Sequence, residues 1–171
     1  VSCLVSSSQH CRRLSARARS SFRFAFGLLP RSQADAMHAL YAYLRVTDDL
    51  ADRPGDVSAK RAALARWRER LHAALGGVCS HRVHPALHHT ARTYDIPGEY
   101  LTAPIDGGER DLSGEPFQSF DELKRYCHQV AGVVGAYTSA VTSAVAKAAE
   151  KYKVPLVNPV ASKEDITRQG Y

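Results

Sequence analysis

The feature that most limits the fold is a long segment of helical character, from about residue 33 to residue 52. It is rich in Ala and Leu, which are strong helix formers. Pro30 lies near its start, and Ser32 is expected to cap the first turn, with Asp35 three residues on in place of the usual Glu. Residues 53–56, of sequence RPGD, end the segment because proline cannot continue a helix and glycine favours a turn. One long helix is therefore predicted here.

Four further segments also have helical patterns, at about residues 58–75, 84–94, 98–106 and 120–146. The segment 58–75 begins with Ser58 as its expected cap. It has one apolar face and one Arg-rich face, so Trp67 is expected in the core and the arginines in solvent. Strand signals are almost absent before residue 150. The sequence therefore predicts an all-α fold, a helical bundle whose short loops make neighbouring helices antiparallel.

Size and charge narrow the alternatives. The 171 residues suit one domain, and the longest near-apolar run, about residues 130–136, is far shorter than the roughly 20 residues that span a bilayer. Residues 1–19 are rich in Ser and Arg and are predicted to be a disordered basic leader. The first 30 residues contain five arginines and no acid, within a net charge of +6. Such a stretch attracts phosphate groups or an acidic membrane surface, so peripheral membrane association stays open.

Nucleic acid is disfavoured as a partner, because the aromatic residues near these arginines do not alternate with them as a stacking platform requires. Residues 1–11 have too few consecutive apolar residues for a secretory signal, and the four cysteines show no CxxC spacing. We therefore expect reduced thiols and a cytoplasmic location. A zinc site is a weaker alternative to a plain loop entering a helix, and it would use Cys79, His81, His84, His88 and His89.

A stripe of polar residues lies on the first long helix. Tyr41, Arg45, Asp48 and Asp52 are spaced by 4, 3 and 4 residues, which places them within roughly 60° of one another around the helix axis. Two carboxylates one turn apart repel each other, and a hard divalent cation such as Mg²⁺ would relieve this repulsion. Arg45 offers a planar cation for phosphate oxygens. The alternative is a solvated acidic helix end, although carboxylates there oppose the helix dipole.

Three separated segments carry a resemblance to a known family. Residues 20–52 contain a Ser-Phe start, a Leu-Pro pair and an Ala-Leu-Tyr helix that leads to the pattern Arg-x-x-Asp-Asp-x-x-Asp. Residues 84–112 include GGERDL, and residues 119–135 read SFDELKRYCHQVAGVVG. In this order, over about residues 20–135, they resemble the squalene/phytoene synthases, which join two prenyl diphosphates head to head. This resemblance implies an all-α isoprenoid synthase fold, here in truncated form, and Mg²⁺-assisted ionisation of a farnesyl or geranylgeranyl diphosphate.

The resemblance also implies roles for individual residues. Magnesium would be bound by Asp48 and Asp52, with Asp49 in support. Diphosphate would be held by Arg45, Tyr41 and Ser21, and the prenyl tunnel would be lined by Phe22 and Phe26. Further apolar lining would come from Val130, Ala131, Val133 and Val134, with Gly132 and Gly135 allowing a bend or a close approach. Asp111 matches a family position of less certain role.

Two features depart from the family pattern. Its second Asp-rich motif is absent, since no Asp occurs between Asp121 and Asp165. Residues 135–171 instead resemble part of a periplasmic branched-chain amino-acid-binding protein, with Thr138 and Ser139 in its ligand-contacting Ser/Thr loop and a short α/β-like helix and strand. These features predict three parts: a leader (1–19), the front of the synthase domain (20–135) and an unrelated tail (136–171). A fused or truncated reading frame joined near Gly135 would explain them; a natural helix with chance similarity is the alternative.

Three functions follow from these observations. The first is a prenyltransferase that condenses two prenyl diphosphates into a squalene- or phytoene-type product. The second is a catalytically incomplete fragment that only binds prenyl diphosphate, and the third is a fragment of a solute-binding protein. The sequence leaves open the oligomeric state and the chain length of the substrate.

Overall fold

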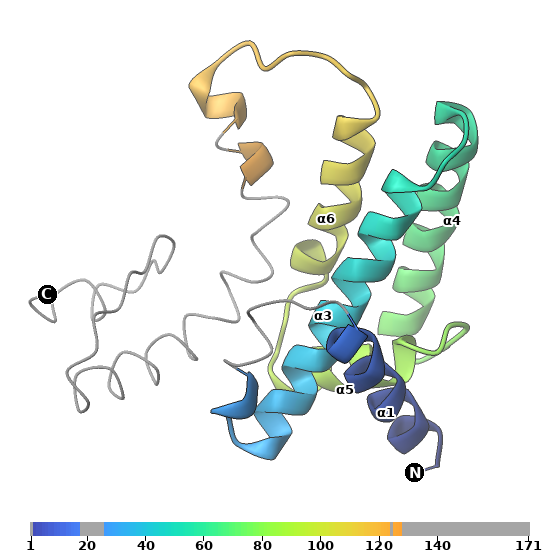
Figure 1. Ribbon diagram of the computed structural model, residues 1–171, viewed down its shortest axis with the longest axis vertical. Helices are drawn as coiled ribbons and strands as arrows, with labels where there is room; N and C mark the ends of the chain where they lie inside the picture. The colour runs from blue at the N-terminus through green and yellow to red at the C-terminus, as the bar shows by residue number, and fades with distance from the viewer. Residues whose placement is uncertain (1, 18–25, 124, 128–171) are drawn as a thin grey trace, which may run out of the picture.

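The computed structural model describes residues 2–17, 26–123 and 125–127 (Figure 1). Its long helices are α1 (Ser2–Arg17), α3 (Arg31–Asp52), α4 (Val57–Leu75), α5 (His84–Thr93) and α6 (Gly98–Asp111). The prediction of an all-α fold is confirmed, because every regular element in these described ranges is a helix. In the same ranges no helix is both long enough and apolar enough to cross a membrane.

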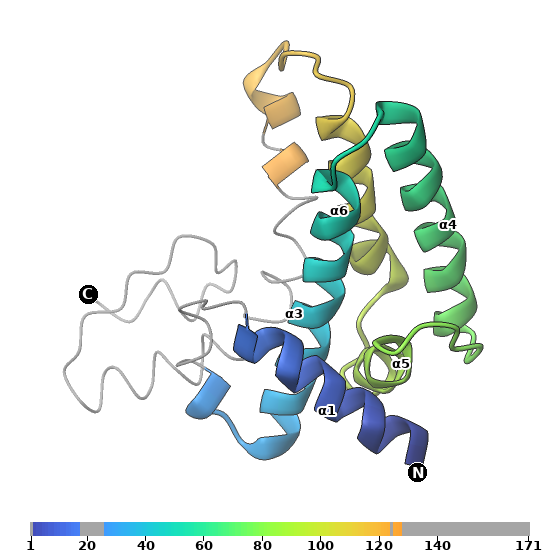
Figure 2. The same cartoon turned by 45° about the vertical axis from the view of Figure 1, so that its right-hand side comes forward.

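Helices α3, α4 and α6 stand side by side, and α1 and α5 pack at the amino-terminal end of α3 (Figures 1 and 2). Helix α4 runs opposite to α3 and α6, so the carboxyl ends of α3 and α6 lie at the same end of the molecule (Figure 1). The core between the helices is aliphatic and aromatic, with Leu40, Leu64, Leu71, Leu87 and Ile105 almost fully enclosed. This topology places the last turn of α3 beside the last turn of α6.

The predicted disorder of the leader is wrong for residues 2–17, which form α1 and pack against α3 and α5. Cys11 is fully buried, and the Ser7 hydroxyl donates to the Arg82 carbonyl (2.7 Å) and accepts from the Ala86 amide (3.0 Å). Arg12 forms an ion pair with Asp35 of α3 at 2.5 Å. The buried face consists largely of small serine and cysteine side chains, which a search for apolar periodicity does not detect.

The helix caps differ from the predicted ones. Pro30 precedes α3 and no side chain caps it, so Ser32 is not the cap. Helix α4 is capped by Asp56, whose carboxylate accepts from the Ala59 amide at 2.7 Å, and not by Ser58. Aspartate serves this role as well as serine, because either side chain can accept from a free amide of the first turn. The ends of α3 at Asp52 and of α4 at Leu75 agree with the prediction.

Helix α6 continues past its predicted end at Asp106 and reaches Asp111. Gly107 and Gly108 are poor helix formers but are buried within it. A Cβ at Gly108 would make ordinary van der Waals contact with Ala51 at 3.5 Å and with Leu64 at 3.6 Å, so α6 lies directly against α3 and α4 at this point. This packing outweighs the weak helix propensity and carries Asp111 to the end of the bundle. Of the helix predicted over 120–146, residues 120–123 and 125–127 are described and are helical.

A polar chain crosses the core where α3, α4 and α6 meet. The indole of Trp67 stacks on Tyr43 and donates to the Thr47 hydroxyl at 2.9 Å. Thr47 in turn donates to the Tyr43 carbonyl at 3.0 Å, and the Tyr43 hydroxyl donates to the Leu101 carbonyl. Trp67 is therefore a core residue, as predicted. Because every member has a partner, the chain fixes the three helices to one another without an unpaired buried donor.

Candidate functional site

A pocket of about 220 Å³ lies between the carboxyl-terminal halves of α3 and α6. Asp48 and Asp52, one turn apart on α3, line one wall, and Asp111, the last residue of α6, lines the other. Thr47 and Gly108 lie between them. The structure thus brings together two residues of the predicted magnesium site and Asp111, whose role the sequence left undefined.

The pocket carries the negative charge of three carboxylates. Burial raises the pKa of the Asp48 carboxyl, and the negative charges of Asp52, Asp49 and Asp111 raise it further, while Arg45 acts in the opposite direction. The carboxyl ends of α3 and α6 also add the negative poles of two helix dipoles. Carboxylates gathered in this way hold excess negative charge, and a bound cation would neutralise it.

Arg45 and Asp49 lie on the flank of this pocket and do not line it. They form an ion pair with each other at 2.7 Å, and more than half of each side chain is exposed, at 52% and 55%. Asp49 is thus turned toward Arg45 in this structure. An exposed pair of this kind contributes at most about 1 kcal/mol, so a ligand at the mouth of the pocket could separate the two residues at small cost.

The aromatic residues predicted for the apolar tunnel are placed only in part. Phe26 is 4% exposed and packs edge-on against His38 and Tyr41 of α3, with ring centroids 5.1 and 6.4 Å away. Tyr41 is partly buried on the same helix as the two pocket aspartates. The remaining predicted contacts lie outside the described residues: Ser21, Phe22, Val130, Ala131, Gly132, Val133, Val134, Gly135, Thr138 and Ser139.

Other side chains hold the pocket in place, and the sequence did not identify them. Arg68 of α4 donates to Asp106 at 2.6 Å and to Glu109 at 2.9 Å, which fixes α6 against α4. Burial and the nearby carboxylate of Asp111 raise the pKa of Tyr126 to about 12. The Arg68 contacts join residues about 40 positions apart in the sequence, so no local sequence pattern predicts them.

The predicted Cys/His zinc patch is not assembled. Cys79 and His81 line a separate surface hollow, whereas His84 is fully buried against Trp67. In the described part of the chain, no three His, Cys, Asp or Glu side chains come close enough to hold one metal ion among them. A cation at the acidic pocket would therefore need water or ligand oxygens in addition to the protein's carboxylates.

The crowding of carboxylates gives a first prediction. In metal-free buffer at pH 7, Asp48→Asn is expected to raise the free energy of unfolding. A carboxyl whose pKa is raised in the folded state destabilises the fold when it is ionised. This penalty disappears as the pH falls below the pKa that the carboxyl has in the unfolded chain, about 3.9. In urea unfolding, the variant should therefore have a higher free energy of unfolding than the parent at pH 7, and this difference should decrease as the pH is lowered to 4. If Asp48→Asn were less stable than the parent at pH 7, the proposed repulsion between the pocket carboxylates would be contradicted.

The fold is that of the all-α isoprenoid synthases. The crystal structure of squalene synthase HpnC from Alicyclobacillus acidocaldarius matches with a TM-score of 0.68 and 28% sequence identity, over 75% of this chain and 48% of that one. A crystal structure of a dehydrosqualene synthase in complex with ligand matches with a TM-score of 0.64 and 23% identity, over 95% of this chain and 63% of that one.

The chain belongs to the squalene/phytoene synthase family, whose sequence model matches residues 15–154. Phytoene synthase of Arthrospira platensis is 33% identical over 131 residues, which cover 77% of this chain and 42% of that protein. The chloroplastic phytoene synthase of Daucus carota is 34% identical over 125 residues, which cover 73% of this chain and 31% of that protein. The chain thus spans less than half the length of these relatives.

The family match bears on the predicted tail. It continues past Gly135 to residue 154, so the family similarity is not confined to residues 20–135. It also begins at residue 15, inside α1. The predicted resemblance of residues 135–171 to an amino-acid-binding protein gains no support from these comparisons.

Proposed function

We propose that this chain binds a prenyl diphosphate as its magnesium complex and takes part in head-to-head condensation of two such molecules. The observation that supports this most directly is the acidic pocket at the joined ends of α3 and α6. Membership of the squalene/phytoene synthase family supports this class of reaction, and the substrate that the resemblance implies is farnesyl or geranylgeranyl diphosphate. The product would be of the squalene or phytoene type.

The donor set of the pocket suits magnesium. Mg²⁺ takes hard oxygen ligands and is typically bound through one or two carboxylates, with water and substrate phosphate completing its shell. Asp48 and Asp52 provide two such carboxylates, and burial together with the neighbouring carboxylates raises the pKa of Asp48. When bound, the metal would stabilise the charge that develops on a departing diphosphate. Asp49 would become a further magnesium ligand only after its ion pair with Arg45 is broken.

The protein's own residues would act around this metal complex. Arg45, exposed at the edge of the pocket, would give up Asp49 and donate to the diphosphate oxygens. Tyr41 lies in the middle of α3, on the amino-terminal side of Asp48, and Phe26 packs against it. There the two rings would contact the prenyl chain and keep water from the allylic cation. The bond to be cleaved, between the prenyl carbon and the diphosphate oxygen, would thus lie between the acidic carboxyl end of α3 and the aromatic residues at its middle.

A second candidate is a chain that binds prenyl diphosphate without turning it over. The sequence favours it at one point, because the second Asp-rich motif that the family resemblance implies does not occur in these 171 residues. Binding and chemistry therefore require separate measurements.

The experiment measures both on the 171-residue chain. Calorimetric titration with geranylgeranyl diphosphate is expected to show saturable binding with Mg²⁺ and at least tenfold weaker binding with EDTA, a difference of about 1.4 kcal/mol. Release of inorganic diphosphate in the same mixture would support condensation, and binding without release would support the second candidate. Absence of binding at any magnesium concentration would overturn both.

A further inference from the structure

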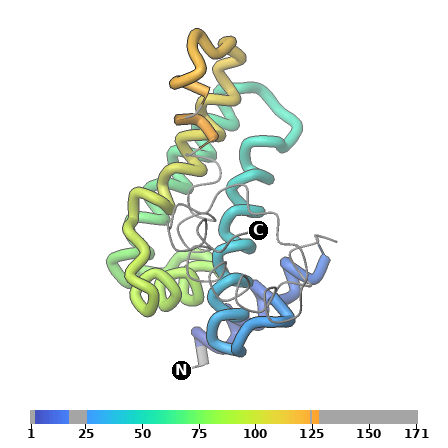
Figure 3. The backbone as a smooth tube through the Cα atoms, turned by 90° about the vertical axis from the view of Figure 1, so that its left-hand side faces the viewer, coloured from blue at the N-terminus to red at the C-terminus, as the bar shows by residue number. Residues whose placement is uncertain are grey.

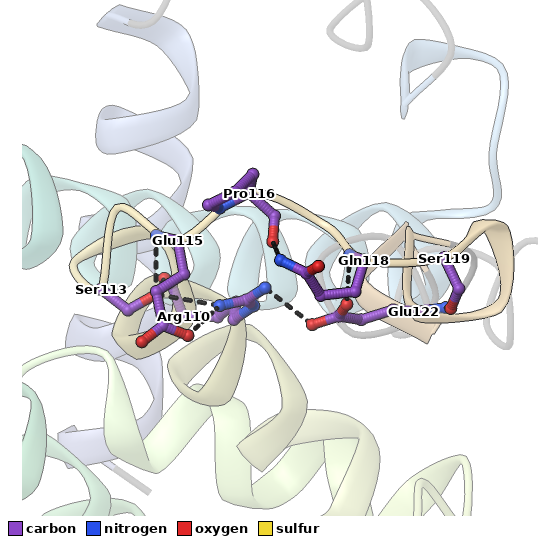
Figure 4. Close-up of polar contacts among 7 residues, drawn as sticks. All are labelled: Arg110, Ser113, Glu115, Pro116, Gln118, Ser119 and Glu122. Atoms are coloured by element: carbon purple, nitrogen blue, oxygen red, sulfur yellow. Dashed lines mark hydrogen bonds and ion pairs between the residues drawn. The ribbon is translucent and has the colours of Figure 1, made fainter.

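Two clusters of polar side chains lie outside the acidic pocket, and they differ in whether their donors are used. Around Arg110, the guanidinium donates to Glu122 at 2.7 Å, to the Ser113 hydroxyl at 3.0 Å and to Glu115 at 3.3 Å (Figure 4). This side chain is occupied by contacts within the protein. The second cluster surrounds a cavity at the amino-terminal end of α3, and several of its polar groups have no partner among the described residues.

This cavity measures about 350 Å³ and lies where α1, the first turns of α3 and α5 meet. Its volume falls in the range of about 300–1,000 Å³ that is typical of small-molecule sites. Leu4 and Ala36 give it an apolar part, whereas Ser8, Arg31 and Thr90 bring polar groups from three different helices. The amino-terminal end of α3 and the acidic pocket lie at opposite ends of the bundle (Figure 3), so a ligand here is remote from the proposed magnesium site.

Thr90 is the observation that points most directly to a ligand. Only 3% of this residue is exposed, it lines the cavity, and its hydroxyl has no hydrogen-bond partner in the described part of the chain. A threonine within a helix often donates to the carbonyl four residues earlier, as Thr47 does to Tyr43 at 3.0 Å. An enclosed hydroxyl without such a partner is unfavourable, and an acceptor oxygen of a ligand relieves that cost.

The charges around the cavity favour a negative ligand. Arg31 has no ion-pair partner among the described residues, whereas Arg12 and Asp35 neutralise each other at 2.5 Å. One guanidinium is therefore left without a counter-charge. The first turn of α3, which contributes Arg31 and Ser32 to the cavity, has no side-chain cap. Free amides and the positive pole of a helix dipole at such an end attract anions.

We propose that this cavity binds the phosphate group of a monoester, with the phosphate against Arg31 and the uncapped first turn of α3. The hydroxyls of Ser8 and Thr90 donate to its oxygens. A phosphate monoester has three terminal oxygens, which suit donors that come from three helices, whereas a carboxylate has only two. The carbon part of the ligand lies beside Leu4 and Ala36. This site needs no metal and goes beyond the proposed function.

The test is a calorimetric titration of the full 171-residue chain with glycerol 3-phosphate and with inorganic phosphate, in phosphate-free buffer that contains EDTA. Saturable binding is expected. Arg31→Gln should weaken it at least tenfold, and Thr90→Val, which keeps the side-chain shape, about threefold to tenfold. Removal of an unpartnered hydroxyl should leave Thr90→Val at least as stable as the parent, so urea unfolding separates lost binding from lost folding.

Arg53→Gln is the matched control, since Arg53 is an exposed arginine that follows the carboxyl end of α3 and does not line the cavity. It should bind as the parent does. The inference is overturned if no phosphate probe binds, if Arg31→Gln binds as tightly as the parent, or if Arg53→Gln loses as much affinity as Arg31→Gln.

A second arm identifies the source of the phosphate. Vesicles of phosphatidylcholine are compared with vesicles that also contain phosphatidic acid, whose headgroup is a phosphate monoester. Binding of glycerol 3-phosphate indicates a soluble ligand, and Arg31-dependent binding to phosphatidic acid alone indicates a lipid headgroup. Because EDTA removes magnesium, these titrations do not depend on the acidic pocket, so this inference and the proposed function can fail independently.

Discussion

The double variant Asp48→Asn/Asp52→Asn is expected to lose magnesium-dependent affinity for geranylgeranyl diphosphate by about a hundredfold or more, or ~2.7 kcal/mol. Asparagine keeps the size of each side chain but removes the charge that a hard cation requires. Asp111 would be the one carboxylate left among the described residues that line the pocket. The measurement is a calorimetric titration with and without EDTA, as for the parent chain.

Charge-matched controls are available elsewhere in the chain. Asp95 and Asp121 are exposed residues outside the pocket, so Asp95→Asn/Asp121→Asn changes the net charge equally. This control should bind as the parent does. Equal loss in both double variants would mean that overall charge, and not the pocket, governs binding. Unchanged affinity in Asp48→Asn/Asp52→Asn would remove the main support for the proposed site.

A second large effect, on the free energy of unfolding, is expected when the pH is lowered. His84 is fully buried, packs on Trp67 with centroids 5.0 Å apart, and has no hydrogen-bond partner for either ring nitrogen among the described residues. Burial lowers its pKa to about 4, and the positive charges of His81 and Arg70 act in the same direction. The unfolded chain therefore binds this proton more readily, and the stability due to neutral His84 is complete above pH 6.5.

Between pH 6.5 and pH 4 this contribution should fall by about 3 kcal/mol. His84→Leu removes the titrating group, so its free energy of unfolding should decline less with acid than that of the parent, by about that amount. Urea unfolding followed by circular dichroism at pH 7 and pH 4 measures the difference. His89→Leu, an exposed histidine on the same helix, is the matched control and should keep the slope of the parent. Parallel pH profiles for His84→Leu and the parent would contradict the assignment.

The parts of the fold that follow from the sequence are those set by local chemistry. The proline-bounded segment around residues 33–52 became α3, and the four-three-four spacing did place Asp48 and Asp52 on one face of it. Spacing alone could not show that Asp49 and Arg45 pair with each other on the flank. That choice depends on the side-chain rotamers, which periodicity does not determine.

The parts that the sequence did not predict are set by contacts between distant residues. Helix α1 is stable because Ser7 and Cys11 fit against α5 and α3, and small polar residues give no amphipathic signal. Helix α6 extends to Asp111 because Gly108 packs close to Ala51 and Leu64. The third carboxylate of the pocket therefore depends on tertiary packing that overrides local propensity.

Helix α4 lines no part of the acidic pocket, yet it contacts both helices that do. Trp67 binds Thr47 of α3, and the neighbouring Arg68 binds Asp106 and Glu109 of α6, so two consecutive residues of α4 join the two walls. Helix α4 thus acts as a spacer. A change of side-chain volume at Trp67 is therefore expected to alter the gap between the α3 and α6 carboxylates without touching either.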